Sequence, residues 1–179
     1  LTFLDDRLLL GGEGAVSVLT RDTRDPALES KSIPGFIKNL VDPKVSTSFD
    51  YSYAGKMSFY NEASATRVSF GVKMIGPGYT SLGVPNLRTD QFGYEGKIDQ
   101  RLFENKFSIG TFFKQYKDNL IQWKRSTTKT TAFGINAGLN LPRLPFLRVT
   151  YSPYFQKNDD PNPARQIDNS TTMYSAMTG

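Results

Sequence analysis

The chain has 179 residues, a formal net charge of +5 at pH 7, and neither histidine nor cysteine. Without these two residue types it cannot form a serine–histidine dyad, a cysteine nucleophile, a disulfide or a histidine- or cysteine-based metal site. No apolar run approaches the roughly 20 residues of a membrane-spanning helix. We therefore expect neither an enzyme nor a helical membrane protein, and we expect no cofactor and no metal.

Apolar and polar residues alternate with period two in seven segments of the chain. Successive side chains of a strand point to opposite faces, so each segment is predicted to be a strand with one apolar and one polar face. The segment 48–59 alternates most clearly, and the segment 7–20 is the least regular. In chain order the segments are 7–20, 48–59, 67–74, 92–102, 107–114, 132–141 and 147–156.

The connections between these segments alternate between short and long. Tight turns are predicted around Asp5-Asp6, Asn61-Glu62, Glu104-Asn105 and Pro142 to Pro145. Long loops are predicted at 21–45, 75–90, 117–128 and 157–171, where Gly76-Pro77-Gly78 is a turn. Bacterial outer-membrane barrels have short periplasmic turns and long external loops. The pattern therefore predicts an all-β, antiparallel transmembrane outer-membrane β-barrel with these four loops outside the cell.

We expect residues 1–179 to be seven to eight consecutive strands of a larger barrel, within a longer chain. The alternative is a closed eight-strand barrel, since small barrels start at about eight strands. Pro153 does not fit an ordinary strand, because proline cannot donate a ladder hydrogen bond. We expect a bulge there, or that part of the strand outside the membrane.

The alternation also assigns side chains to faces. The expected lipid-facing residues are Tyr51, Tyr53, Phe70, Val72, Ile109, Ile135 and Val149. The expected lumen-facing residues are Lys73, Glu95, Lys97, Asp99 and Arg148, together with Asp50 and Asn136. Cations outnumber carboxylates on this polar face, so an open lumen would favour anions. Alternatively, ion pairs or further strands neutralise these charges.

An apolar cluster lies within the loop 21–45, and a turn of amphipathic helix at 35–41 would explain its spacing. Such a cluster either packs on the barrel mouth or docks a partner protein. It consists of Ile33, Phe36, Ile37, Leu40 and Val41.

The segments Gly11 to Pro26 and Ile75 to Leu120 resemble those of uncharacterised large outer-membrane β-barrel proteins of Bacteroidota. The resemblance depends on a Gly-Pro-x-Tyr-x-Ser-Leu-Gly segment at Gly76 to Gly83, on Arg88 to Asp90, and on Asp118 to Leu120. It implies a cell envelope that also contains type IX secretion, gliding and glycan-uptake machinery. It transfers no chemistry to any residue.

The leading functional prediction is a structural or scaffolding component of an envelope complex, in the outer membrane of a Gram-negative bacterium. Its expected partners are outer-membrane lipid and proteins of that complex, and the small-molecule substrate is open. The second prediction is a channel or transporter with an anion-favouring lumen. The third is a soluble β-sandwich binding domain, because period two alone does not distinguish a lipid face from a core face. Nucleic acid is not an expected partner, because the basic residues are dispersed.

Overall fold

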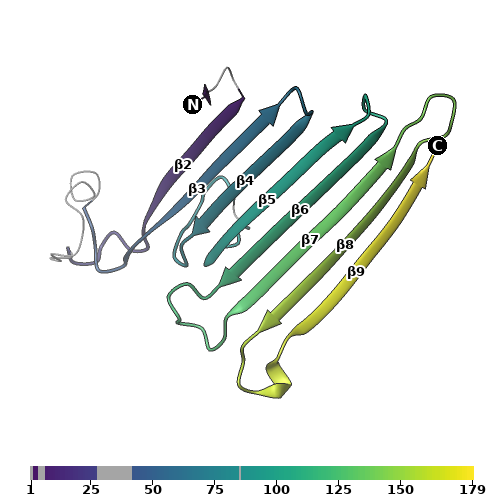
Figure 1. Cartoon of the computed structure of the whole chain (residues 1–179). Helices are drawn as coiled ribbons and strands as arrows, with labels where there is room; N and C mark the ends of the chain where they lie inside the picture. Colours follow the sequence, from purple (N-terminus) through teal and green to yellow (C-terminus); the bar gives the residue numbers. More distant parts are fainter. Residues whose placement is uncertain (1, 4–6, 28–41, 85) are drawn as a thin grey trace.

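A computed structural model describes residues 2–3, 7–27, 42–84 and 86–179 of the chain. These residues form one antiparallel sheet in which every strand pairs with its neighbours in sequence, in the order β1 to β9 (Figure 1). Apart from a short 3-10 helix, η1 (Pro163–Arg165), no helix occurs in the described part. The prediction of an all-β antiparallel fold is confirmed.

Eight of the strands are long, and β1 (Thr2–Phe3) has two residues. The long strands are β2 (Leu8–Thr20), β3 (Thr47–Asn61), β4 (Thr66–Ile75), β5 (Gln91–Leu102), β6 (Phe107–Asp118), β7 (Thr128–Leu139), β8 (Leu147–Asn158) and β9 (Asp168–Thr178).

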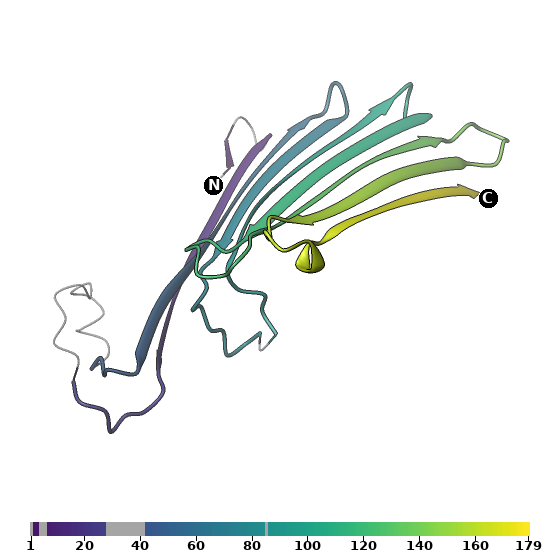
Figure 2. The ribbon, with the colours of Figure 1, turned by 90° about the horizontal axis from the view of Figure 1, so that it is seen from below.

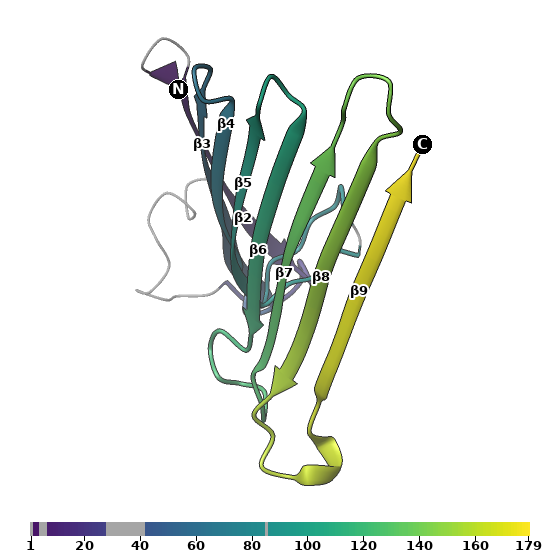
Figure 3. The same ribbon diagram turned by 45° about the vertical axis from the view of Figure 1, so that its right-hand side comes forward.

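The sheet is curved and open. Figure 2 and Figure 3 show its curvature, and Figure 1 shows β2 and β9 at its two sides. No pairing joins β2 to β9, so the described residues do not form the closed eight-strand barrel of the alternative prediction. They also form no second sheet of the kind that a β-sandwich requires.

The register carries each face from strand to strand. Val68, Ile98, Thr111, Ile135 and Tyr151 stand opposite one another across β4 to β8. Directly opposed residues lie on the same face of an antiparallel pair. The alternation along each strand therefore adds up to one mostly apolar face and one mostly polar face over the whole sheet.

The apolar face is exposed. Phe49 is 43% exposed, Ile135 46% and Val149 47%, and Ile75 is the one residue of the described part in the buried hydrophobic core. A soluble domain normally buries such a face against another layer of structure. The sheet has no such layer among its described residues.

Short and long connections lie at opposite ends of the sheet (Figure 1). The short-turn end carries 62–65, 103–106 and 140–146. The long-loop end carries the described residues of four longer connections, which are 21–27 and 42–46, 76–84 and 86–90, 119–127, and 159–167. The turn 103–106 has Asn105 at φ 69, the left-handed region that tight hairpins require.

The predicted loop 157–171 is longer than the observed one, because β8 and β9 both extend into it. Sequence alternation did not predict the extent of β9, since this strand has apolar and polar residues on both of its faces. Met173 and Met177 lie on the polar face, opposite Ser152 and Arg148, and Thr172 lies on the apolar face. Backbone pairing with β8, which does not depend on side-chain polarity, determines where β9 begins.

Of the two alternatives predicted at Pro153, the bulge is wrong, and a position outside the membrane stays a prediction. The same register holds before and after Pro153, from Ala132↔Tyr154 to Ile135↔Tyr151, so no residue is inserted. Pro153 is fully buried. On its face Phe133 of β7 stacks with Phe155 and meets Tyr151 edge to face, with ring centroids 6.3 Å apart in both pairs. The buried proline therefore lies on a face where three aromatic rings pack together.

Two predicted features lie outside the described residues. They are the turn at Asp5-Asp6 and the apolar cluster of the loop 21–45, with its residues Ile33, Phe36, Ile37, Leu40 and Val41.

Candidate functional site

The five charged residues predicted to share a lumen face do lie on one face of the sheet. Lys73 stands opposite Gly93, which precedes Glu95, Lys97 and Asp99 by even steps along β5. The register then runs from Arg101 through Ser108 and Gly138 to Arg148. The structure thus shows that these residues share a polar face, and a lumen next to that face remains a prediction.

Two ion pairs lie on the polar face. Lys97 Nζ is 2.7 Å from Asp99 Oδ2 along β5, and Lys114 Nζ is 3.3 Å from Glu95 Oε2 across β5 and β6. All four side chains are more than a third exposed. Exposed pairs of this kind stabilise a fold by about 0–1 kcal/mol. They neutralise two lysines locally, but they do not join into one network.

Five other cations on this face have no carboxylate of the described residues within salt-bridge distance. They are Lys56, Arg67, Lys73, Arg101 and Arg148. The carboxylates left over on the face are Glu13 and Asp50, and Asp50 accepts hydrogen bonds from backbone N–H groups. The polar face therefore carries unneutralised positive charge.

Most of this charge gathers at the short-turn end, in what we call the rim pocket. The rim pocket is a cavity of about 650 Å³ lined by Tyr60, Glu62, Ala65, Arg67, Lys97, Asp99, Gln100, Arg101, Asn105, Ser108, Ile109, Asn136 and Arg148. Four of these side chains are cationic and two are carboxylates. Because Asp99 is already paired with Lys97, the pocket has spare donors for an anion.

Three side chains of the rim pocket lie close over glycines of the sheet. A Cβ on Gly110 would come within 2.9 Å of both Asn136 and Asp99, and one on Gly138 would come within 2.6 Å of Ser108. At the side, the Arg67 guanidinium lies 5.4 Å from the centroid of the Tyr60 ring. This cation–π contact orients Arg67 without neutralising it.

A central pocket of about 390 Å³ lies further along the same face. Its charged side chains are Glu13, Lys56, Lys73 and Glu95, so cations and carboxylates balance. An anion would therefore favour the rim pocket over the central pocket.

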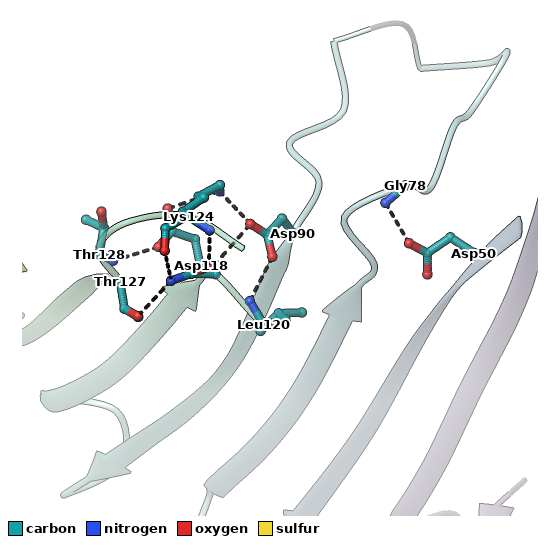
Figure 4. Close-up of polar contacts among 9 residues, drawn as sticks. Asp50, Gly78, Asp90, Asp118, Leu120, Lys124, Thr127 and Thr128 are labelled. Carbon is teal, nitrogen blue, oxygen red and sulfur yellow. Dashed lines mark hydrogen bonds and ion pairs between the residues drawn. The ribbon is translucent and has the colours of Figure 1, made fainter. Parts of the chain in front are cut away.

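The loop 76–90 folds back over the polar face. Gly78 N–H donates to Asp50 Oδ2 at 2.6 Å (Figure 4). Thr80 N–H donates to Ser17 Oγ at 3.0 Å. Asp50 and Ser17 are polar-face residues opposite each other on β3 and β2. Any side chain at Gly76 would collide with the Asp50 carboxylate. The Gly76-Pro77-Gly78 turn thus brings the loop onto the face.

A cluster around Asp90 ties two loops together at the long-loop end (Figure 4). The Asp90 carboxylate, 4% exposed, accepts hydrogen bonds from Asn119 N–H at 3.1 Å and Leu120 N–H at 2.8 Å. Lys124 Nζ lies 2.5 Å from Asp90 Oδ2 and 3.4 Å from Asp118 Oδ2. We call Asp90, Asp118, Asn119 and Lys124 the loop clasp.

The loop clasp shifts the ionisation of its members. Burial alone would raise the pKa of Asp90, but Lys124 and the N–H groups of Leu120 and Asn119 outweigh burial and hold that pKa below its ordinary 3.8. Burial alone would lower the pKa of Lys124, but Asp90 and Asp118 raise it above its ordinary 10.5. Each group thus stabilises the charged form of the other.

Sequence reasoning missed the loop clasp and the position of Phe112. Asp90 and Lys124 lie in connections, where no periodicity relates distant residues. Phe112 lies on the polar face, opposite Lys97, with its ring over Gly134, where any Cβ would collide with it. Aromatic rings are known to cover glycines on a neighbouring strand of a sheet. The presence of Phe112 and Gly134 was therefore the sequence feature that could have indicated this position.

Neither the described side chains nor comparison with known proteins assigns a further site to the chain. The described residues contain no group of carboxylates that could hold a metal ion. Among them, no helix is long and apolar enough to cross a membrane. No protein-family model, curated protein or solved structure matches the chain.

Proposed function

We propose that this sheet is part of the wall of an outer-membrane β-barrel, with its apolar face against lipid and its polar face along a passage for small anions. The observation that carries the proposal is the distribution of side chains over one sheet. Apolar residues from β2 to β8 are exposed on one face, and most charged residues of these strands lie on the other. In water an apolar patch of this extent needs a cover, and lipid provides one.

Aromatic side chains at the two ends of the strands also support a membrane. Phe103, in a short turn, is 75% exposed, and Trp123, in the loop 119–127, is 63% exposed. Exposed aromatics at both ends of apolar strands are typical of the two membrane interfaces.

The excess of cations in the rim pocket supports anions as the solute class. Basic linings favour anion passage by lowering the electrostatic energy of the anion in the pore. The scaffolding function and a place in an envelope complex remain predictions, because the apolar cluster of the loop 21–45 lies outside the described residues.

The membrane part of the proposal is tested by placing the same charge on either face. Ile135→Arg should cost about 2 to 4 kcal/mol in lipid if it lies near the bilayer midplane, and Val72→Arg should act in the same direction. Thr150→Arg, on the polar face of β8, is the matched control and should fold as the unmodified protein does. The measurement is the folded fraction in phosphatidylcholine vesicles, read by heat-dependent gel mobility. Equal folding of Ile135→Arg and Thr150→Arg would show that the face assignment is wrong.

The passage is tested separately by conductance in planar bilayers. Replacing both Arg101 and Arg148 with Glu should lower the anion-to-cation permeability ratio, and Lys73→Glu should lower it less. Arg165→Glu, in η1 beyond the strands, is the control and should leave the ratio unchanged. A folded protein that does not conduct would refute the proposed passage but not the proposed barrel wall.

A further inference from the structure

Three lysines form a row on the apolar face at the long-loop end. Lys117 of β6 stands opposite Lys129 of β7, and Lys129 stands opposite Lys157 of β8. The row continues to Phe92 of β5 on one side and to Asp168 of β9 on the other. These lysines lie on the face that otherwise carries Phe113, Phe133 and Ile135. The alternation of the sequence did not predict them.

Like charges directly opposite each other across strands destabilise a sheet. Here the repulsion is only partly relieved within the chain. Lys157 Nζ lies 3.1 Å from Asp168 Oδ2, in a pair that is about two thirds exposed. Lys117 Nζ lies 5.8 Å from the centroid of the Phe92 ring. No carboxylate of the described residues reaches Lys117 or Lys129. The row therefore lacks sufficient counter-charge of its own.

The residues next to the row change in polarity step by step. Two positions further into the sheet, Tyr94 Oη donates to Gln115 Oε1 at 2.7 Å, and Gln115 Nε2 donates to Thr131 Oγ1 at 3.0 Å. Two positions further again, Phe113 stands opposite Phe133. From the centre of the sheet toward the long-loop end, the side chains on this face are thus first aromatic, then neutral and hydrogen-bonded, and finally cationic. A bilayer has the same order of acyl chain, interface and headgroup.

At the other end of the same face, the described residues contain no such row. Leu102, Phe107, Leu139 and Leu147 stand in register there, at the short turns. The cationic row therefore belongs to one membrane surface only, the surface on the side of the long loops.

We propose that Lys117, Lys129 and Lys157 bind the phosphate groups of anionic lipid headgroups in the leaflet next to the long loops. This inference rests on the proposed membrane wall, and it deepens that proposal by naming the lipid that the wall selects. Lysine ammonium groups bind phosphate as point charges, and each contributes attraction toward an anionic bilayer surface. The lipid headgroup supplies the counter-charge that the row lacks.

The test is lipid binding to the detergent-purified full chain, read by native mass spectrometry with added phosphatidylglycerol or phosphatidylcholine. The unmodified protein should retain phosphatidylglycerol in preference to phosphatidylcholine. Replacing Lys117, Lys129 and Lys157 with Gln should weaken phosphatidylglycerol binding by about fivefold per lysine, roughly a hundredfold in all. Replacing the same three lysines with Arg should preserve binding, which separates lost charge from misfolding.

The matched control replaces Lys56, Lys73 and Lys106 with Gln, which removes the same charge from the polar face and a short turn. It should retain phosphatidylglycerol as the unmodified protein does. Equal lipid binding by the row variant and the unmodified protein would overturn the proposal. So would binding of inorganic phosphate or polyglutamate that matches the lipid in strength and in its dependence on the row, since the occupant would then be a free anion or an acidic protein.

The two proposals fail in different ways. If Ile135→Arg folds normally in vesicles, the membrane wall is wrong, whatever the lipid binding. If Ile135→Arg blocks folding and the lysine row has no effect on phosphatidylglycerol, only the lipid site is wrong.

Discussion

The two ends of the polar face use charge in different ways. At the long-loop end, Asp90 is buried and fully bonded to Lys124 and two backbone N–H groups. At the short-turn end, Arg67, Arg101 and Arg148 are exposed and have no carboxylate of the described residues within salt-bridge distance. Buried, paired charge fixes the position of loops. Exposed, unpaired charge remains available for a solute. The same residue types therefore give a structural end and an end that we propose to bind anions.

The loop clasp should be the more costly end to disturb. Asp90→Ala leaves the Lys124 ammonium and two N–H groups without their acceptor, and it should lower the free energy of unfolding by about 2 to 4 kcal/mol. Asp90→Asn tolerates the φ of 55 at this position and should cost less, because one acceptor oxygen remains. Urea unfolding in detergent provides the measurement. Glu104→Gln, which breaks an exposed pair with Lys106, is the control. A loss for Asp90→Ala no larger than that of the control would remove the distinction between the ends.

Gly76 should be the next most sensitive position. A Cβ there would collide with the Asp50 carboxylate, so Gly76→Ala should force the loop off the polar face at a cost of about 1 to 3 kcal/mol. Gly83→Ala is the matched control in the same loop, because no atom lies within 4 Å of its Cβ position. Limited proteolysis of the loop should accelerate in the first variant alone. Similar cleavage of both variants would contradict the packing of the loop on Asp50.

Acid should open the loop clasp gradually. Because the folded-state pKa of Asp90 lies below 3.8, its contribution to stability is present above pH 3.8 and is lost as the pH falls through the lower folded value. Hydrogen exchange at the Asn119 and Leu120 amides should reveal this opening, relative to a strand amide such as that of Ile135. Acid exchange that is identical in the unmodified protein and in Asp90→Asn would contradict the assignment.

The exposed pairs of the polar face should contribute least. Lys97→Gln breaks the pair with Asp99, in which the lysine side chain is 56% exposed, and it should change the unfolding free energy by less than about 1 kcal/mol. In the same variant Asp99 becomes an uncompensated carboxylate in the rim pocket, so anion preference should fall even though stability does not. A variant in which stability falls and selectivity is retained would reverse the comparison between the two ends.

The strands were predictable because alternation reports directly on which side of a strand each side chain lies. Phe49, Tyr51 and Tyr53 alternate with Asp50 and Ser52, and the structure keeps these two sets on opposite faces of β3. The shared face of Lys73, Glu95, Lys97, Asp99 and Arg148 follows from the same rule once the register is known.

The remaining features depend on information that periodicity does not contain. Asp90 meets Lys124 because two loops come together in space, and the sequence gives no spacing rule for that. Strand β9 forms through backbone pairing although its polarity pattern is mixed. The lysine row requires the register of three strands at once, since each lysine alone resembles an ordinary strand end.

The fold-back of the loop 76–90 has a consequence for permeability. In the proposed passage, a segment held on the polar face by Asp50 and Ser17 would reduce the open cross-section, and it would act as a size filter at a different depth from the rim pocket. Charge selection and size selection would then be performed by separate parts of the chain. Shortening the loop between Tyr79 and Val84 should admit larger neutral sugars into liposomes while the preference for anions stays the same.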